Sequence, residues 1–132
     1  MTQSISTLAI LVPSYDEGLA FFRDAVVEDT PLEGVKRWAA VAPAGGEGAR
    51  IALAVPTDDR QRARVGPQTG GRVGYFLETR NFDRDYDGLM TCGVRFLELP
   101  RRESYGTVAV FADPWGGKWD LIQPNRPDDA RP

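Results

Sequence analysis

The chain of 132 residues contains no histidine, and this absence excludes several kinds of chemistry. Imidazole is the usual general base near neutral pH, a common ligand of transition metals and the central member of a Ser-His-Asp triad. The one cysteine, Cys92, can form no intrachain disulfide and has no imidazole to activate it as a nucleophile. We therefore expect Cys92 to be a core or helix-end residue, and any activity to proceed without imidazole.

Long apolar runs and an excess of basic charge are also missing. The apolar part of the N-terminal stretch MTQSISTLAILV is too short for a membrane span, and no basic segment precedes it as in a signal peptide. The 16 basic and 19 acidic residues are mixed along the chain, and their net charge of -3 does not attract a phosphate backbone. These features predict a cytoplasmic protein that binds neither nucleic acid nor membrane.

The stretch YGTVAVFADPWGGKWDLIQP, residues 105–124, predicts two strands joined by a tight turn. β-Branched and aromatic residues before the turn favour a strand, and Asp-Pro-Trp-Gly-Gly supplies the proline and the glycines that tight turns use. After the turn, charged or mixed residues alternate with large apolar ones. This period of two is typical of a half-buried strand.

The order of predicted elements repeats in the two halves of the chain. Ser14 with Glu17 forms a capping-box pattern for the first helix, and Asn81 can cap the second. The apolar face of the first helix is predicted at Tyr15, Leu19, Phe22 and Val26, and that of the second at Phe82, Tyr86, Leu89 and Met90. Strands are predicted at 5–12, 26–30, 35–42 and 50–55 in the first half, and at 73–79, 94–98, 107–111 and 118–123 in the second.

Each half therefore has the order β-α-β-β-β, which indicates an internal duplication. We predict a single domain over residues 1–124, with module one at about 1–56, a polar linker at 57–71 and module two at 72–124. The linker is expected to be a solvated stretch or a short exposed helix. The segment 125–132, rich in proline, aspartate and arginine, is predicted to be a mobile tail.

An aromatic residue followed by glycine, an apolar strand and then F-x-D-P-x-G-x-x-W-x-L-x-Q resembles the last two strands of the vicinal oxygen chelate superfamily. This superfamily includes glyoxalase I, bleomycin-resistance proteins and extradiol dioxygenases. The segments LVPSYDEGLAFF, RWAAVAP, GGRVGYFLET and RDYDGLMTCGVRF resemble the family at the expected places, so the resemblance covers nearly the whole chain. It implies an α+β fold of two βαβββ modules forming a curved, cleft-bearing mixed sheet, and a homodimer. The alternative fold is a ferredoxin-like α/β sandwich.

The resemblance also gives the positions at which the family holds a divalent metal. These positions correspond here to Thr7, Ala52, Gly74 and Asp120, and only the aspartate is a good ligand. A hard cation needs about six oxygen ligands and zinc about four N, S or O ligands. We therefore expect no metal and no cofactor in this protein.

Side-chain alternation predicts which residues line the cleft instead. Small residues such as Ala9 and Ala54 leave volume open, while Trp38, Trp115 and Trp119 are expected to pack in the core or at the turn. Asp120 is either a ligand-binding anchor or the partner of Arg50 or Lys118 in an ion pair that compensates its burial. The predicted ligand-binding residues are Thr7, Arg50, Ala52, Gly74, Phe76, Tyr105, Lys118 and Asp120.

Three functions are compatible with the predicted fold and cleft. The first is a metal-free binding protein of the bleomycin-resistance kind, which holds a small aromatic or hydrophobic molecule in the cleft. The second is a metal-dependent lyase, isomerase or dioxygenase of the glyoxalase type. The third is a metal-free enzyme with Asp120 or Glu78 as the base and an arginine as an electrophilic clamp. The scaffold alone does not choose among them.

Overall fold

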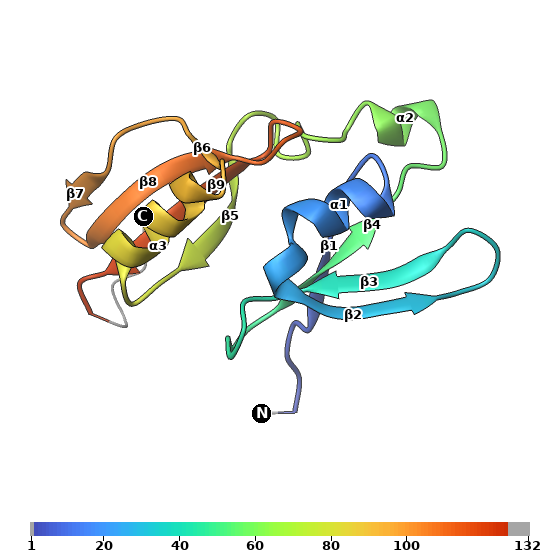
Figure 1. Cartoon of the computed structure of the whole chain (residues 1–132), viewed down its shortest axis with the longest axis horizontal. Coiled ribbons are helices and arrows are strands. Elements are labelled where there is room, and N and C mark those ends of the chain that lie inside the picture. The colour runs from blue at the N-terminus through green and yellow to red at the C-terminus, as the bar shows by residue number, and fades with distance from the viewer. Residues whose placement is uncertain (1, 127–132) are drawn as a thin grey trace. The chain divides into compact units, whose positions relative to one another are not determined.

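The computed structural model describes residues 2–126, which divide into two compact units between Val65 and Gly66 (Figure 1). The division falls inside the segment 57–71 that the sequence predicts as a linker. This segment contains the short helix α2, Asp59–Arg62, whose N-cap Asp58 accepts a hydrogen bond from the Gln61 amide.

The first unit is a sheet with one helix packed on it. Its strands are in the order β1-β4-β3-β2, with β1 and β4 parallel and the other pairs antiparallel. The elements are β1 (Thr7–Leu11), α1 (Tyr15–Phe21), the 3-10 helix η1 (Arg23–Ala25), β2 (Val26–Pro31), β3 (Arg37–Val41) and β4 (Arg50–Ala54).

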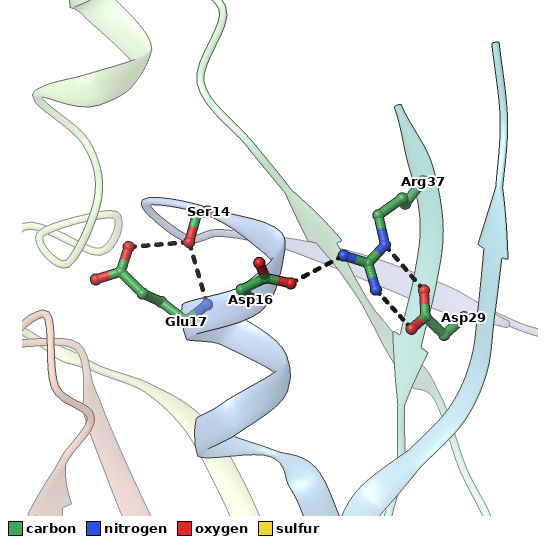
Figure 2. Close-up of polar contacts among 5 residues, drawn as sticks. All are labelled: Ser14, Asp16, Glu17, Asp29 and Arg37. Carbon is green, nitrogen blue, oxygen red and sulfur yellow. Dashed lines mark hydrogen bonds and ion pairs between the residues drawn. The ribbon is translucent and has the colours of Figure 1, made fainter. Parts of the chain in front are cut away.

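The N-terminus of α1 is fixed by the residues that predicted it. The Ser14 hydroxyl accepts a hydrogen bond from the Glu17 amide at 3.1 Å and donates to the Glu17 carboxylate at 3.0 Å (Figure 2). Arg37 on β3 binds Asp29 on β2 at 2.6 Å and Asp16 on α1 at 3.1 Å, so it ties the helix to the sheet.

Helix α1 is shorter than the sequence predicts. Phe22 is its C-cap, and Val26 already begins β2, so neither lies on the predicted helical face. The helix lies close to the sheet because Gly18 has no side chain: an added Cβ would be 2.9 Å from Leu53 and 3.1 Å from Val12. The apolar core of this unit therefore lies between α1 and the face of the sheet that carries Ile10 and Leu53, both buried.

The second unit repeats this order around a longer helix. Within the described residues, its strands follow the path β5-β9-β8-β6, with β7 also paired to β8 and with β5 and β9 parallel. The elements are β5 (Val73–Glu78), α3 (Phe82–Thr91), β6 (Arg95–Phe96), β7 (Arg101–Glu103), β8 (Gly106–Ala112) and β9 (Lys118–Pro124).

The prediction of one continuous strand at 94–98 is wrong, because the strand is interrupted. Regular pairing is limited to Arg95 and Phe96, and β7 follows as a separate short strand that was not predicted. Pro100 has no amide hydrogen to donate to a ladder, and the Glu98 carboxylate accepts the hydrogen bond of the Val110 amide at 3.1 Å. A side chain thus replaces the backbone partner where the chain leaves the sheet.

The core of the second unit is a row of aromatic rings between α3 and the sheet. Phe82 and Tyr86 of the helix stack at 5.6 Å, and Tyr86 contacts Phe96 at 4.4 Å. Met90, predicted on this face, is instead 52% exposed. The row continues through Phe111 and Trp119 to Tyr75, which stacks on Trp119 at 4.5 Å.

The turn between β8 and β9 is organised by Asp113, which is buried. Its carboxylate accepts hydrogen bonds from the amides of Trp115 and Gly117 and from the Trp119 indole, at 3.1, 2.8 and 3.1 Å. Gly117 has to lack a side chain, because an added Cβ would collide with this carboxylate. The aspartate therefore connects the turn directly to the aromatic core.

These observations confirm the predicted α+β fold of two βαβββ modules, and the ferredoxin-like alternative is wrong. No helix within residues 2–126 has the length and apolarity that crossing a bilayer requires. The predicted tail at 125–132 lies mostly outside the described residues. Its first residue, Asn125, is held by hydrogen bonds to the carbonyls of Ser104 and Tyr105.

We expect Asp113→Ala to lower the free energy of unfolding by about 2–4 kcal/mol, since it removes the acceptor of three donors, two of them in buried hydrogen bonds. Urea unfolding followed by circular dichroism measures this loss. Asp87→Ala, an exposed change on α3, is the control and should alter stability by no more than about 0.5 kcal/mol. Equal losses in the two variants would contradict the role of Asp113.

Candidate functional site

The face of the first sheet opposite α1 carries small side chains. Register pairs Ala9 with Ala52 and Ala52 with Ala40, and paired residues point to the same side of a sheet. Thr7 pairs with Arg50 in the same ladder. The structure therefore brings together the predicted residues Thr7, Arg50 and Ala52 on one face.

Arg50 has a partner that the sequence did not suggest. Its guanidinium binds Glu28 on β2 at 2.6 Å. Trp38, expected to be a packing residue, is 40% exposed and pairs with Thr30, on the same side of the sheet as Ala40. Alternation along β3 could have assigned Trp38 to this face, because Trp38 and Ala40 are two residues apart.

The face of the second sheet opposite α3 contains the buried carboxyl group of Asp120. In the register of the sheet, Asp120 lies beside Phe76 on β5 and beside Val110 on β8. Lys118 is two residues away on β9 and shares this face, whereas Trp119 and Leu121 point toward the helix side, as predicted. Phe76 is 55% exposed, while Asp120 is only 6% exposed.

One oxygen of Asp120 has no hydrogen-bond partner. Within residues 2–126, Oδ1 is buried and receives no donor. The ion pairs of these residues include none between Lys118 and Asp120. Burial raises the pKa of Asp120, the nearby positive charge of Arg101 lowers it and the negative charge of Glu98 raises it. The net effect is a carboxyl group with a raised pKa.

Arg101 is the cation whose charge lowers the pKa of Asp120, but two other carboxylates accept its hydrogen bonds. Its Nε donates to Glu98 at 2.9 Å, and its Nη1 donates to Glu103 at 2.7 Å. Arg101 pairs with Val108 in the β7–β8 ladder, which puts it on the face of the sheet that carries Asp120. The sequence did not indicate Glu98 and Arg101, because nothing in the local pattern revealed β7.

Three other predicted residues have distinct surroundings. The space beside Gly74 is not open, since an added Cβ would be 2.4 Å from a methyl carbon of Thr69. Tyr105 lies in the turn between β7 and β8, at the opposite end of β8 from the residues that flank Asp120. Glu78 pairs with Ile122 and is exposed, so it lies on the face that carries Asp120, at the end of β5.

The residues at the family's metal positions do not form a donor set that fits a divalent metal. Thr7, Ala52 and Gly74 offer one hydroxyl between them, and Asp120 offers a single carboxylate. Across residues 2–126, no group of three or more Cys, Asp or Glu side chains comes together as metal ligands do. Glu98, the acid that influences Asp120, is already bound to Arg101. No catalytic step through a metal follows from this site.

A separate hollow of about 420 Å³ lies at the N-terminus of α3 and contains none of the predicted ligand-binding residues. Two amide groups there already have acceptors: Asn81 caps the Arg84 amide, and Gln123 accepts the hydrogen bond of the Phe82 amide at 2.8 Å. Its lining is Arg80, Asn81, Phe82, Asp83, Arg102, Thr107, Gln123, Pro124 and Asn125.

Comparison with known proteins places this architecture in a family. The sequence pattern of the Glyoxalase/Bleomycin resistance protein/Dioxygenase superfamily matches residues 4–121. An uncharacterized protein of Shewanella frigidimarina (strain NCIMB 400) is 42% identical over 130 residues, covering 95% of this chain and 96% of the relative. The chain belongs to the Glyoxalase/Bleomycin resistance protein/Dioxygenase superfamily, as its resemblance to the vicinal oxygen chelate proteins predicted.

Solved structures are similar over most of the chain. The crystal structure of UcmS2 has a TM-score of 0.78 and 25% identity, and covers 92% of this chain and 98% of its own. TnmS3, an antibiotic binding protein from Streptomyces sp. CB03234, has a TM-score of 0.71 and 25% identity, with 95% and 99% covered.

The raised pKa of Asp120 makes a testable difference to stability. Ionisation of Asp120 in the folded protein lowers the free energy of unfolding. This loss of stability is absent below the ordinary carboxyl pKa of 3.8, and it grows as the pH rises from 3.8 through the pKa that Asp120 has in the folded protein. We expect Asp120→Asn to have a higher melting temperature than the wild type near pH 7, and the gap to close toward pH 3.8. Thermal unfolding at several pH values measures it. A gap independent of pH would contradict this assignment.

Proposed function

We propose that the protein binds a small aromatic or hydrophobic molecule without a metal, and that the ligand lies against the face of the second sheet opposite α3. The observation that carries this proposal is the buried, unpartnered Asp120 carboxyl beside the exposed ring of Phe76. A binding site for a small molecule combines apolar surface with a few polar groups that fix orientation. This face has both.

Family membership supports the proposal without fixing the ligand. TnmS3, which is similar over nearly the whole chain, is an antibiotic binding protein. The donor set at the family's metal positions is poor, which favours binding over metal-assisted chemistry. The row of small residues on the first sheet, with Trp38 exposed beside it, offers a second apolar face suited to a flat molecule.

We expect a panel of flat aromatic metabolites and antibiotics to contain molecules that bind, as measured by isothermal titration calorimetry. Phe76→Ala should weaken the binding of these molecules roughly tenfold, because it removes the exposed ring beside Asp120.

The control is Met90→Ala, which truncates a similarly exposed apolar side chain on α3, behind the other face of the sheet. This variant should bind like the wild type. Absence of binding across the panel would contradict the proposed function, and equal effects of the two truncations would contradict the proposed location.

We also infer that the protein acts in the cytoplasm as a homodimer, which is the expectation for this family. Light scattering after size-exclusion chromatography should give twice the mass of one chain. A single-chain mass at micromolar concentration would contradict this inference.

A further inference from the structure

The unpaired acceptor Asp120 Oδ1 indicates that the ligand carries a hydrogen-bond donor. The residue is 94% buried, and Oδ1 has no donor in the described part of the chain. Leaving a carboxylate buried without a hydrogen bond is costly, and such groups in folded proteins are usually paired or hydrogen-bonded. A donor from a ligand would remove this cost.

The charges around Asp120 favour a positive ligand over a negative one. The charged side chains that share its face are Glu78 on β5, Lys118 on β9, Arg95 on β6, Arg101 and Glu103 on β7, and Glu98 between β6 and β7. Arg101 is held by Glu98 and Glu103. With Asp120 ionised, four carboxylates therefore face three cations, and one of these cations is already shared by two acids.

The neighbour of Asp120 on β5 indicates what carries the positive group. Phe76 is paired with Asp120 in the parallel ladder, and adjacent strands lie about 4.8 Å apart. Its ring is 55% exposed, so an apolar body can lie on it while a polar group reaches the carboxylate. A cation near an aromatic face gains a further attraction.

We propose that the ligand of this site is an organic ammonium ion on a flat apolar body, and that its N–H donates to Asp120 Oδ1 while the body lies on Phe76. This inference rests on the proposed function and narrows it to one chemical class. Asp120 then determines specificity: it selects a cation over neutral and anionic molecules of the same shape.

Three probes with one bicyclic body and different head groups test the selection. They are 2-naphthylmethylamine, 2-naphthylmethanol and 2-naphthoate, titrated into the full chain by isothermal titration calorimetry near neutral pH. The ammonium probe should bind about tenfold or more tighter than the alcohol, as expected for a hydrogen bond between charged groups, and the carboxylate probe should bind weakest.

Two variants that each remove one negative charge distinguish a direct contact with Asp120 from an effect of the protein's net charge. Asp120→Asn should bring the affinity for the ammonium probe to within about threefold of that for the alcohol, and leave the alcohol nearly unchanged. Asp87→Asn, on the exposed surface of α3, should keep the full preference. Circular dichroism checks that both variants are folded.

A measurement on the wild-type protein makes the test independent of the variants. Titration of the Asp120 carboxyl by carbon NMR should move to lower pH when the ammonium probe is saturating, and should not move with the alcohol. Equal affinity for the three probes, preference for naphthoate or an unmoved titration would overturn the ammonium assignment alone. Absence of binding by all three would overturn the proposed function together with it.

Discussion

The Asp113 carboxylate fixes the β8–β9 hairpin, and the rest of the second unit depends on this hairpin. By accepting two turn amides and the Trp119 indole, it sets where β9 begins and which of its faces carries the aromatic ring. Since side chains alternate along a strand, fixing Trp119 on the helix side fixes Asp120 on the opposite side. Asp113 thereby determines the position of Asp120, the residue proposed to bind the ligand.

The two faces of this sheet have opposite chemistry. The face toward α3 is closed by aromatic rings from helix and strands. The other face keeps a buried carboxyl group with a raised pKa and an exposed phenyl ring. The aromatic side stabilises the fold, and its stability allows the other side to keep a group that is costly to bury.

Much of the fold could be predicted because its signals are local. Ser14 and Asn81 cap the two helices, alternation along 118–123 separates Trp119 from Asp120, and the repeated order of elements gives the two modules. The errors lie where local pattern is overridden. Pro100 and the Glu98 side chain split one predicted strand into β6 and β7, and α1 ends before its apolar pattern does.

The sequence by itself determined the family, the two-module fold and the lack of good ligands at the family's metal positions, since these follow from residue types and their order. Only the tertiary structure decided the partners of the charged groups. Arg50 binds Glu28, Arg101 binds Glu98 and Glu103, and Oδ1 of Asp120 receives no donor from residues 2–126. Arg50 and Glu28 are distant in sequence and meet only through the folded sheet. Arg101 is close in sequence to Glu98 and Glu103, but the distances between their side chains depend on how the chain runs from β6 to β7.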